Sequence, residues 1–167
     1  MRSSFANLKA GRKGLAFVAP ILVALMFAGG LMAQDVKLPL SAIQAKHFAQ
    51  AEGLGKTQEF LNYFYDGLMN YLPKTKVAAT VVGEEATVAE AANAVAVEGT
   101  ILEVKKKGLI GIVRADVSLY RLSDHKLVKQ FVAEVPYKPS PFNKDKNIAE
   151  PAGGRLAYMI QKELKKL

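Results

Sequence analysis

The spacing of apolar residues along the chain predicts two amphipathic helices. In residues 57–72, apolar side chains recur at intervals of three and four, while polar side chains occupy the other faces. Pro73 is expected to end this helix, because proline lacks the backbone N–H that the helical ladder needs. A second helix is predicted to open at Pro151 and to run to Leu167 with one apolar stripe.

Alternation of apolar and polar residues predicts three strands in the second half of the chain. These segments are residues 95–104, 111–122 and 127–135, and the connections between them are short and polar. We expect them to form an antiparallel meander. In the first of them the apolar parity shifts after Gly99, from Val95 and Val97 to Leu102 and Val104, which predicts either a bulge there or a strand covered on both faces.

Shorter segments complete the pattern. Residues 75–82 are β-branched and predict a buried strand, and residues 84–93 predict a short Ala-rich helix with acids at its amino end. Residues 43–51 carry opposed signals, because alanine favours a helix whereas brevity and the following glycines favour a strand, which we expect. Prolines predict a long loop over residues 137–150.

These elements have the order β-α-β-α-β-β-β-α and predict an α+β fold. Each main helix has one apolar stripe to bury, so we expect both helices on one face of a mixed, mostly antiparallel sheet. The chain shows no internal repeat and no low-complexity linker. Residues 34–167 are therefore expected to form a single domain.

Residues 1–33 have the pattern of a signal for export. Residues 1–13 contain four basic side chains and no acid, and residues 15–33 contain no charge. Two interpretations stay open, a cleaved signal peptide and a single-span membrane anchor through residues 15–33, because the uncharged stretch approaches the length that crosses a bilayer. Helix-weakening Pro20, Gly29 and Gly30 favour cleavage near residues 30–34. We expect a periplasmic or secreted protein.

Composition narrows the chemistry further. The 167 residues include no Cys, which excludes a disulfide scaffold, a thiol nucleophile, a Cys-ligated zinc site and lipid attachment to Cys. The formal net charge is +8, and the four positive charges within residues 1–33 leave +4 for the domain. An exported domain with this modest excess is not expected to bind nucleic acid, and its charge suits an anionic membrane surface.

The chain contains no recognisable catalytic pattern. The run from Gly53 to Thr57 ends in Gly-Lys-Thr, but a phosphate loop needs a glycine at position 50, where the chain has Gln50. The two histidines, His47 and His125, are far apart in the sequence and lack the spacing of a metal motif. We therefore expect no enzyme, no cofactor and no metal site.

Lysines gather at one end of the predicted meander. The first strand runs into three consecutive lysines, and the third strand must finish at the same end and lead into the proline-rich loop. Apolar residues at the hairpin tip and lysines around them are typical of a surface that meets an anionic membrane or an acidic protein. Alternatively, the apolar tip folds back onto the core and the lysines only solvate a turn. We call the predicted binding residues the lysine rim: Lys105, Lys106, Lys107, Leu109, Ile110, Lys138, Lys144 and Lys146.

Several segments in succession resemble a known group of proteins. They are TKVAATVV, VAVEGTILEVKKKG, IVRADVSLYRLSDHKLV and the final LAYMIQKELKKL. Over residues 43–167 the chain resembles the TolB amino-terminal and curli-channel (CsgG-like) group of small bacterial periplasmic α/β domains, which includes uncharacterised exported proteins. The resemblance implies protein contacts at the cell envelope and no active site. The chain departs from the group where His125 and Lys126 replace the usual glycine, and it lacks the length for long membrane strands.

Together these observations predict an exported, non-enzymatic cell-envelope domain that binds an envelope protein or an anionic membrane surface. One alternative is a small-molecule-binding or hydrolytic periplasmic protein with a pocket between helices and sheet, where Tyr63, Tyr65 and Tyr158 would supply polar groups. Another alternative is a membrane-anchored structural module. A deep pocket with converging carboxylates would favour the first alternative, and a filled core beside a basic rim would favour binding.

Overall fold

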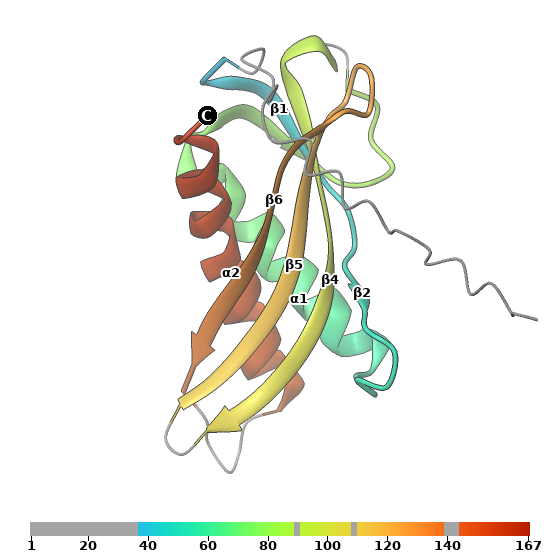
Figure 1. The fold of residues 1–167 in the computed structure, drawn as a ribbon, viewed down its shortest axis with the longest axis vertical. Helices are drawn as coiled ribbons and strands as arrows, with labels where there is room; N and C mark the ends of the chain where they lie inside the picture. Colours follow the sequence, from blue (N-terminus) through green and yellow to red (C-terminus); the bar gives the residue numbers. More distant parts are fainter. Residues whose placement is uncertain (1–36, 89–90, 108–109, 139–143) are drawn as a thin grey trace, which may run out of the picture. The chain divides into compact units, whose positions relative to one another are not determined.

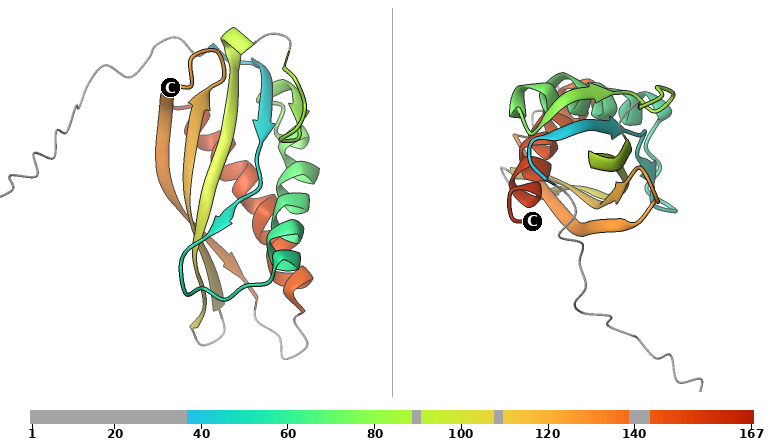
Figure 2. Two further views of the ribbon diagram at one scale, coloured as in Figure 1. Left: turned by 90° about the vertical axis from the view of Figure 1, so that its right-hand side faces the viewer. Right: turned by 90° about the horizontal axis from the view of Figure 1, so that it is seen from above.

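The computed structural model describes residues 37–88, 91–107, 110–138 and 144–167, and the expected signal segment lies outside them. Six strands form one mixed sheet there, and two long helices cover one of its faces (Figures 1 and 2), which confirms the α+β class. The elements are β1 Leu40–Ala45, β2 Ala49–Gln50, α1 Gln58–Tyr71, β3 Ala78–Val82, β4 Ala94–Lys107, β5 Ile110–Arg121, β6 Leu127–Tyr137 and α2 Asp145–Leu164, with 3-10 turns at Leu72–Thr75 and Ala91–Asn93.

The sheet combines parallel and antiparallel pairs in the order β3-β1-β4-β5-β6, with β2 also paired to β4. β1 runs parallel to both β3 and β4. The long strands β4, β5 and β6 form the expected antiparallel meander. β4 and β6 therefore point the same way and finish at the same end of the sheet, where Lys106 pairs with Gly111 and Gly111 pairs with Tyr137.

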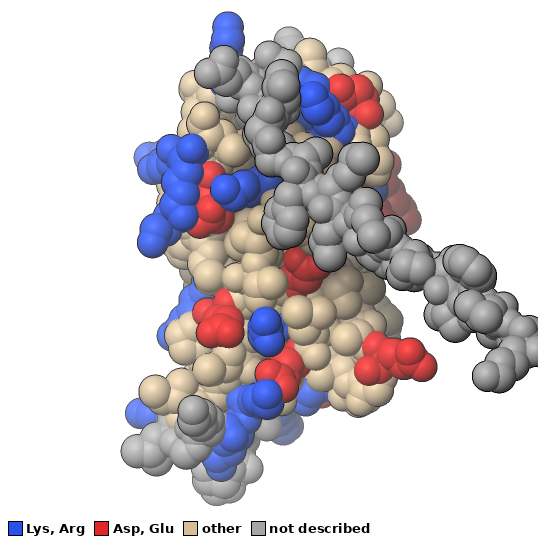
Figure 3. Space-filling view, viewed as in Figure 1, with Lys and Arg blue, Asp and Glu red and all other residues tan. Residues whose placement is uncertain are grey.

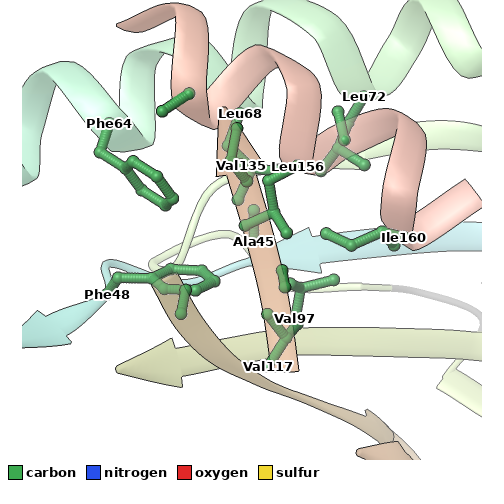
Figure 4. Close-up of a cluster of buried hydrophobic side chains, with 14 of the residues drawn as sticks. Ala45, Phe48, Phe64, Leu68, Leu72, Val97, Val117, Val135, Leu156 and Ile160 are labelled. Carbon is green, nitrogen blue, oxygen red and sulfur yellow. The ribbon is translucent and has the colours of Figure 1, made fainter. Parts of the chain in front are cut away.

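The two helices pack closely because glycines stand where they meet. A Cβ on Gly153 would lie 1.9 Å from the carbonyl oxygen of Phe64, and a Cβ on Gly67 would lie 2.0 Å from that of Glu150. Below the helices, buried side chains from both layers fill the core (Figure 4). Those labelled in the close-up are Phe64, Leu68, Leu72, Leu156 and Ile160 from the helical layer, and Ala45, Phe48, Val97, Val117 and Val135 from the sheet side.

The second long helix starts earlier than its sequence predicts. α2 begins at Asp145, and Pro151 lies inside it on an exposed position. Asp145 in the first turn suits the positive end of the helix dipole, and Ala149 is buried against the core. Burial of this additional turn stabilises helix on the amino-terminal side of Pro151. The prediction of a loop throughout residues 137–150 is therefore wrong.

Two further expectations are corrected. Residues 84–88 form a turn and irregular backbone, where the Gln44 amide donates hydrogen bonds to the carbonyl oxygens of Glu84 and Ala86. Of the short helix expected over residues 84–93, the described residues contain only the 3-10 turn at Ala91–Asn93. β3 is an edge strand with exposed positions, not a buried one. The bulge in β4 lies between Ile101 and Glu103, which confirms the bulge expected from the parity shift after Gly99. Gly99 itself makes room for the ring of Phe48, which would lie 2.3 Å from a Cβ there.

Candidate functional site

The ends of β4 and β6 bring part of the lysine rim together as expected. Lys105 and Lys106 lie near the end of β4, Ile110 opens β5, and Lys138 directly follows β6. Lys and Arg side chains gather at this end of the open face of the sheet (Figure 3). Lys107 ends β4, but its side chain lies outside the described part of the chain, as does all of Leu109.

Ile110 does not fold back onto the core. Its side chain is 55% exposed, which makes it one of the most exposed large apolar residues described. Lys105 forms an ion pair with Glu103 and still has 65% of its side chain exposed. Apolar surface beside lysines is thus presented to the surroundings of the protein, and the alternative of a buried tip is wrong for Ile110.

A tyrosine braces the strand ends beneath these lysines. The ring of Tyr137 covers Gly111, where a Cβ would lie 2.0 Å from the ring. Its hydroxyl donates a hydrogen bond of 3.2 Å to the carbonyl of Lys105 across the sheet. Burial raises the pKa of Tyr137, which keeps the hydroxyl protonated as a donor. The rim is therefore built on a braced β-sheet end.

The other rim residues lie on the helical side of the same end. Lys144 precedes α2, and Lys146 places its Nζ 5.6 Å from the centre of the Tyr63 ring on α1. The sequence interpretation missed Lys56, whose Nζ lies 3.6 Å from Asp145 and 5.0 Å from the Phe60 ring centre. The signal available in the sequence was that Lys56 lies just before a predicted helix. Two helices that pack on one face of a sheet can bring their amino-terminal ends together, as α1 and α2 do here.

Each histidine is stacked on a tyrosine. The ring centroids of His47 and Tyr65 are 3.8 Å apart, and those of His125 and Tyr120 are 4.6 Å apart. Glu84 interacts with His47 Nδ1 and accepts a hydrogen bond from its backbone N–H, both at 3.2 Å. The hydrogen bond from the backbone N–H and that from the ring lower the pKa of Glu84. Among the described residues, no group of three or more His, Cys, Asp and Glu is placed to hold a metal ion.

Buried side chains fill the space between helices and sheet, and the grooves described lie at the surface, over strands or, in one case, between α1 and the turn after β3. Of the tyrosines expected in a pocket there, Tyr65 borders a shallow groove with His47, and Tyr158 is exposed on α2. An apolar groove of about 440 Å³ lies between β1, β3 and Val88. A polar groove of about 340 Å³, the outer groove, lies over β4 and β5 and includes Lys46, Glu98, Thr100, Asp116, Ser118 and Tyr120.

None of the helices in the described ranges combines the length and the apolar content required to cross a membrane. This finding concerns α1 and α2, since residues 1–36 are not described.

Comparison with known proteins gives a likeness of fold. No family model matches the chain, and no curated protein matches it in sequence. A variant PelC dodecamer from Paraburkholderia phytofirmans is 12% identical with a TM-score of 0.52, covering 75% of this chain and 90% of that chain. A second PelC dodecamer from the same organism is 14% identical with a TM-score of 0.50, covering 75% and 91%. An uncharacterised protein is 9% identical with a TM-score of 0.52, covering 79% and 96%.

At these identities the comparisons establish the arrangement of helices and strands and do not establish a function. The resemblance to the TolB amino-terminal and curli-channel group stays a prediction. The chain therefore has an α+β fold similar to that of the bacterial protein PelC.

Proposed function

We propose that this chain is an exported, non-enzymatic binding domain of the cell envelope and that the lysine rim is its contact surface. The observation that carries the proposal is that Ile110, Lys105 and Lys106 are all exposed at the same braced end of the sheet. Sequence features of residues 1–33 support export.

An anionic surface is the partner that this chemistry fits. Each lysine near an anionic lipid surface contributes about 1 kcal/mol of attraction, and an apolar side chain beside it gains by leaving water. Lys105 and Lys106 project from the end of a paired strand, and the bond from Tyr137 holds that end in place. A rigid support lowers the entropy lost on contact. An envelope protein with an acidic patch would use the same side chains.

The test replaces Lys105 and Lys106 with Glu and measures binding to vesicles of anionic and of zwitterionic lipid. The reversal removes two attractive charges and adds two repulsive ones, so binding to anionic vesicles should fall more than about tenfold. Lys162→Glu with Lys165→Glu is the matched control, since both lysines are exposed near the carboxyl end of α2. The control variant should bind as the unchanged protein does.

A parallel capture from envelope extract separates the two kinds of partner. Loss of vesicle binding in the rim variant identifies a membrane surface, and loss of a captured protein with no vesicle binding identifies a protein partner. The proposal fails if the rim variant retains both vesicle binding and every captured protein. It also fails if the purified protein turns over a small molecule.

A further inference from the structure

The outer groove has a chemistry unlike that of the lysine rim. It lies on the face of the sheet that the helices leave open, over β4 and β5. The register places Glu98 opposite Ser118 and Thr100 opposite Asp116. Directly opposed side chains on one face of an antiparallel pair have Cβ atoms about 5 Å apart, and side chains two residues apart on a strand share a face. Asp116 therefore has a hydroxyl across from it and another beside it.

Most charges in the outer groove are already paired. Lys46 forms an ion pair with Glu98, and His47 contacts Glu84. Asp116 accepts two hydrogen bonds, of 3.0 and 3.2 Å, from the neutral amide of Gln130. No cationic side chain in the described ranges forms an ion pair with Asp116. Asp116 is thus a groove carboxylate that no charged lysine or arginine in the described part of the chain neutralises.

The hydroxyls around Asp116 also retain hydrogen-bonding capacity. Neither Thr100 nor Ser118 forms a side-chain hydrogen bond with any described residue, and both are half-buried in the groove. Tyr120 contributes an aromatic ring to the lining, and His125 stacks against that ring. The centre of the groove therefore offers a carboxylate, two hydroxyl oxygens and a nearby π-system.

We propose that the outer groove binds a primary ammonium group on a flexible chain. An ammonium has three N–H donors and no acceptor, which matches acceptance by Asp116, Thr100 and Ser118. A neighbouring Tyr120 ring adds attraction between a cation and a π-system. The Lys46 charge opposes the ligand little because Glu98 neutralises it. The ammonium comes from a lysine side chain of a peptide or from a free polyamine.

This inference is independent of the proposed function, because it concerns a cationic ligand on the open face rather than an anionic partner at the rim. The probes are cadaverine and an acetylated, amidated Gly-Lys-Gly-Lys-Gly peptide. Nuclear magnetic resonance follows the binding of each probe to the protein in the form that cells produce. Backbone amide signals of Thr100, Asp116 and Ser118 should shift on titration. Peptide binding alone identifies a peptide ligand, cadaverine binding alone identifies a free amine, and binding of both identifies the ammonium group itself.

Variants test the acceptors. Asp116→Asn keeps the shape of the side chain and removes its charge, so binding should weaken at least tenfold. Asp66→Asn is the matched control, because Asp66 is an exposed carboxylate on α1, in the helical layer. Thr100→Val combined with Ser118→Ala should weaken binding as well, which gives a second test that retains Asp116. Thermal melting of each variant checks that the fold is retained.

A third probe tests the charge of the ligand itself. Acetylation of both lysines in the peptide removes the ammonium charges and should abolish binding. The proposal is overturned if neither amine probe shifts the groove signals, if Asp116→Asn binds them as tightly as the unchanged protein, or if the acetylated peptide binds equally well. The rim variant, Lys105→Glu with Lys106→Glu, should bind the amine probes as the unchanged protein does, so failure at one surface is distinguishable from failure at the other.

Discussion

Hydrogen bonds from single side chains hold irregular backbone against the sheet. Gln44 donates to the carbonyls of Glu84 and Ala86, each at 2.9 Å. Asn93 accepts from the backbone N–H of Lys37 and donates to the carbonyls of Lys37 and Pro39. Such bonds replace those that a helix or strand would have supplied. The turn that borders the outer groove therefore depends on a few polar residues.

Replacing Glu84 with Gln should reduce stability only where the carboxylate is ionised. Its hydrogen bonds from His47 lower the pKa of Glu84 below the usual value of 4.5, so the folded state favours the charged form. That contribution is present above pH 4.5 and is lost as the pH falls through the lowered pKa. Because Glu84 is exposed, the expected loss at pH 6 is at most about 1 kcal/mol. Urea unfolding at pH 6, 5, 4 and 3 measures it.

Glu85→Gln is the control for this prediction. Glu85 is exposed beside Glu84, and its carboxylate accepts no hydrogen bond from a described residue. The control should differ little from the unchanged protein at any of these pH values. A difference between Glu84→Gln and the unchanged protein that stays constant from pH 6 to pH 3 would contradict the explanation.

Among whole elements, the contact between α1 and α2 depends on the absence of side chains. Gly67 and Gly153 each face the backbone of the other helix at distances that no Cβ permits. Glycine costs up to about 1 kcal/mol relative to alanine inside a helix. Close packing of the two helices over the sheet compensates for this cost, because it allows Leu68 and Leu156 to reach the same core.

Gly153→Ala should destabilise the protein by roughly 1–3 kcal/mol despite the better helix propensity of alanine. The new methyl group would meet the Phe64 carbonyl at 1.9 Å, and neither backbone can move without separating the helices. Gly154→Ala is the matched control, since its Cβ would approach only the half-buried Tyr71 ring, at 2.8 Å. Chemical denaturation measures both variants. Equal free energies of unfolding for the two variants would show that the close contact between Gly153 and the Phe64 carbonyl does not require glycine.

For the whole molecule, the distribution of charge separates three regions. Residues 1–33 hold four basic residues and no acid, the lysine rim holds basic side chains at one end of the sheet, and the outer groove holds paired acids and Asp116. The net charge of the whole chain therefore does not predict the local charge of any of these three regions. Residues 1–33 account for half of the formal charge of +8.

The mature protein is expected to begin between residues 30 and 35. Small residues at Ala28, Gly30 and Ala33 precede the polar Gln34 and Asp35, as a signal peptidase site requires. Intact-mass measurement of the protein from its native envelope tests this expectation. A mass that includes Met1 through Ala33 would instead support retention of the leader as a membrane anchor.

The spacing of apolar residues along the chain was sufficient to predict much of the fold. The helix at residues 57–72 and the three strands of the meander were found because their apolar residues recur with the period of a helix or of a strand, although the period in β4 is interrupted at its bulge. The direction of β4 and β6 followed from that meander, and it located Lys105, Lys106, Ile110 and Lys138 at one end of the sheet. The binding role of these residues stays a prediction.

The amino-acid sequence by itself determined the fold class, the meander and the shared end of its strands, because hydrophobic periods of 2 and 3.6 are properties of neighbouring residues. Only the tertiary structure decided that α2 runs through Pro151, that Lys56 meets Asp145, and that Asp116 lies in a groove between Thr100 and Ser118. These features depend on contacts between distant segments, where burial and hydrogen bonding outweigh local preference.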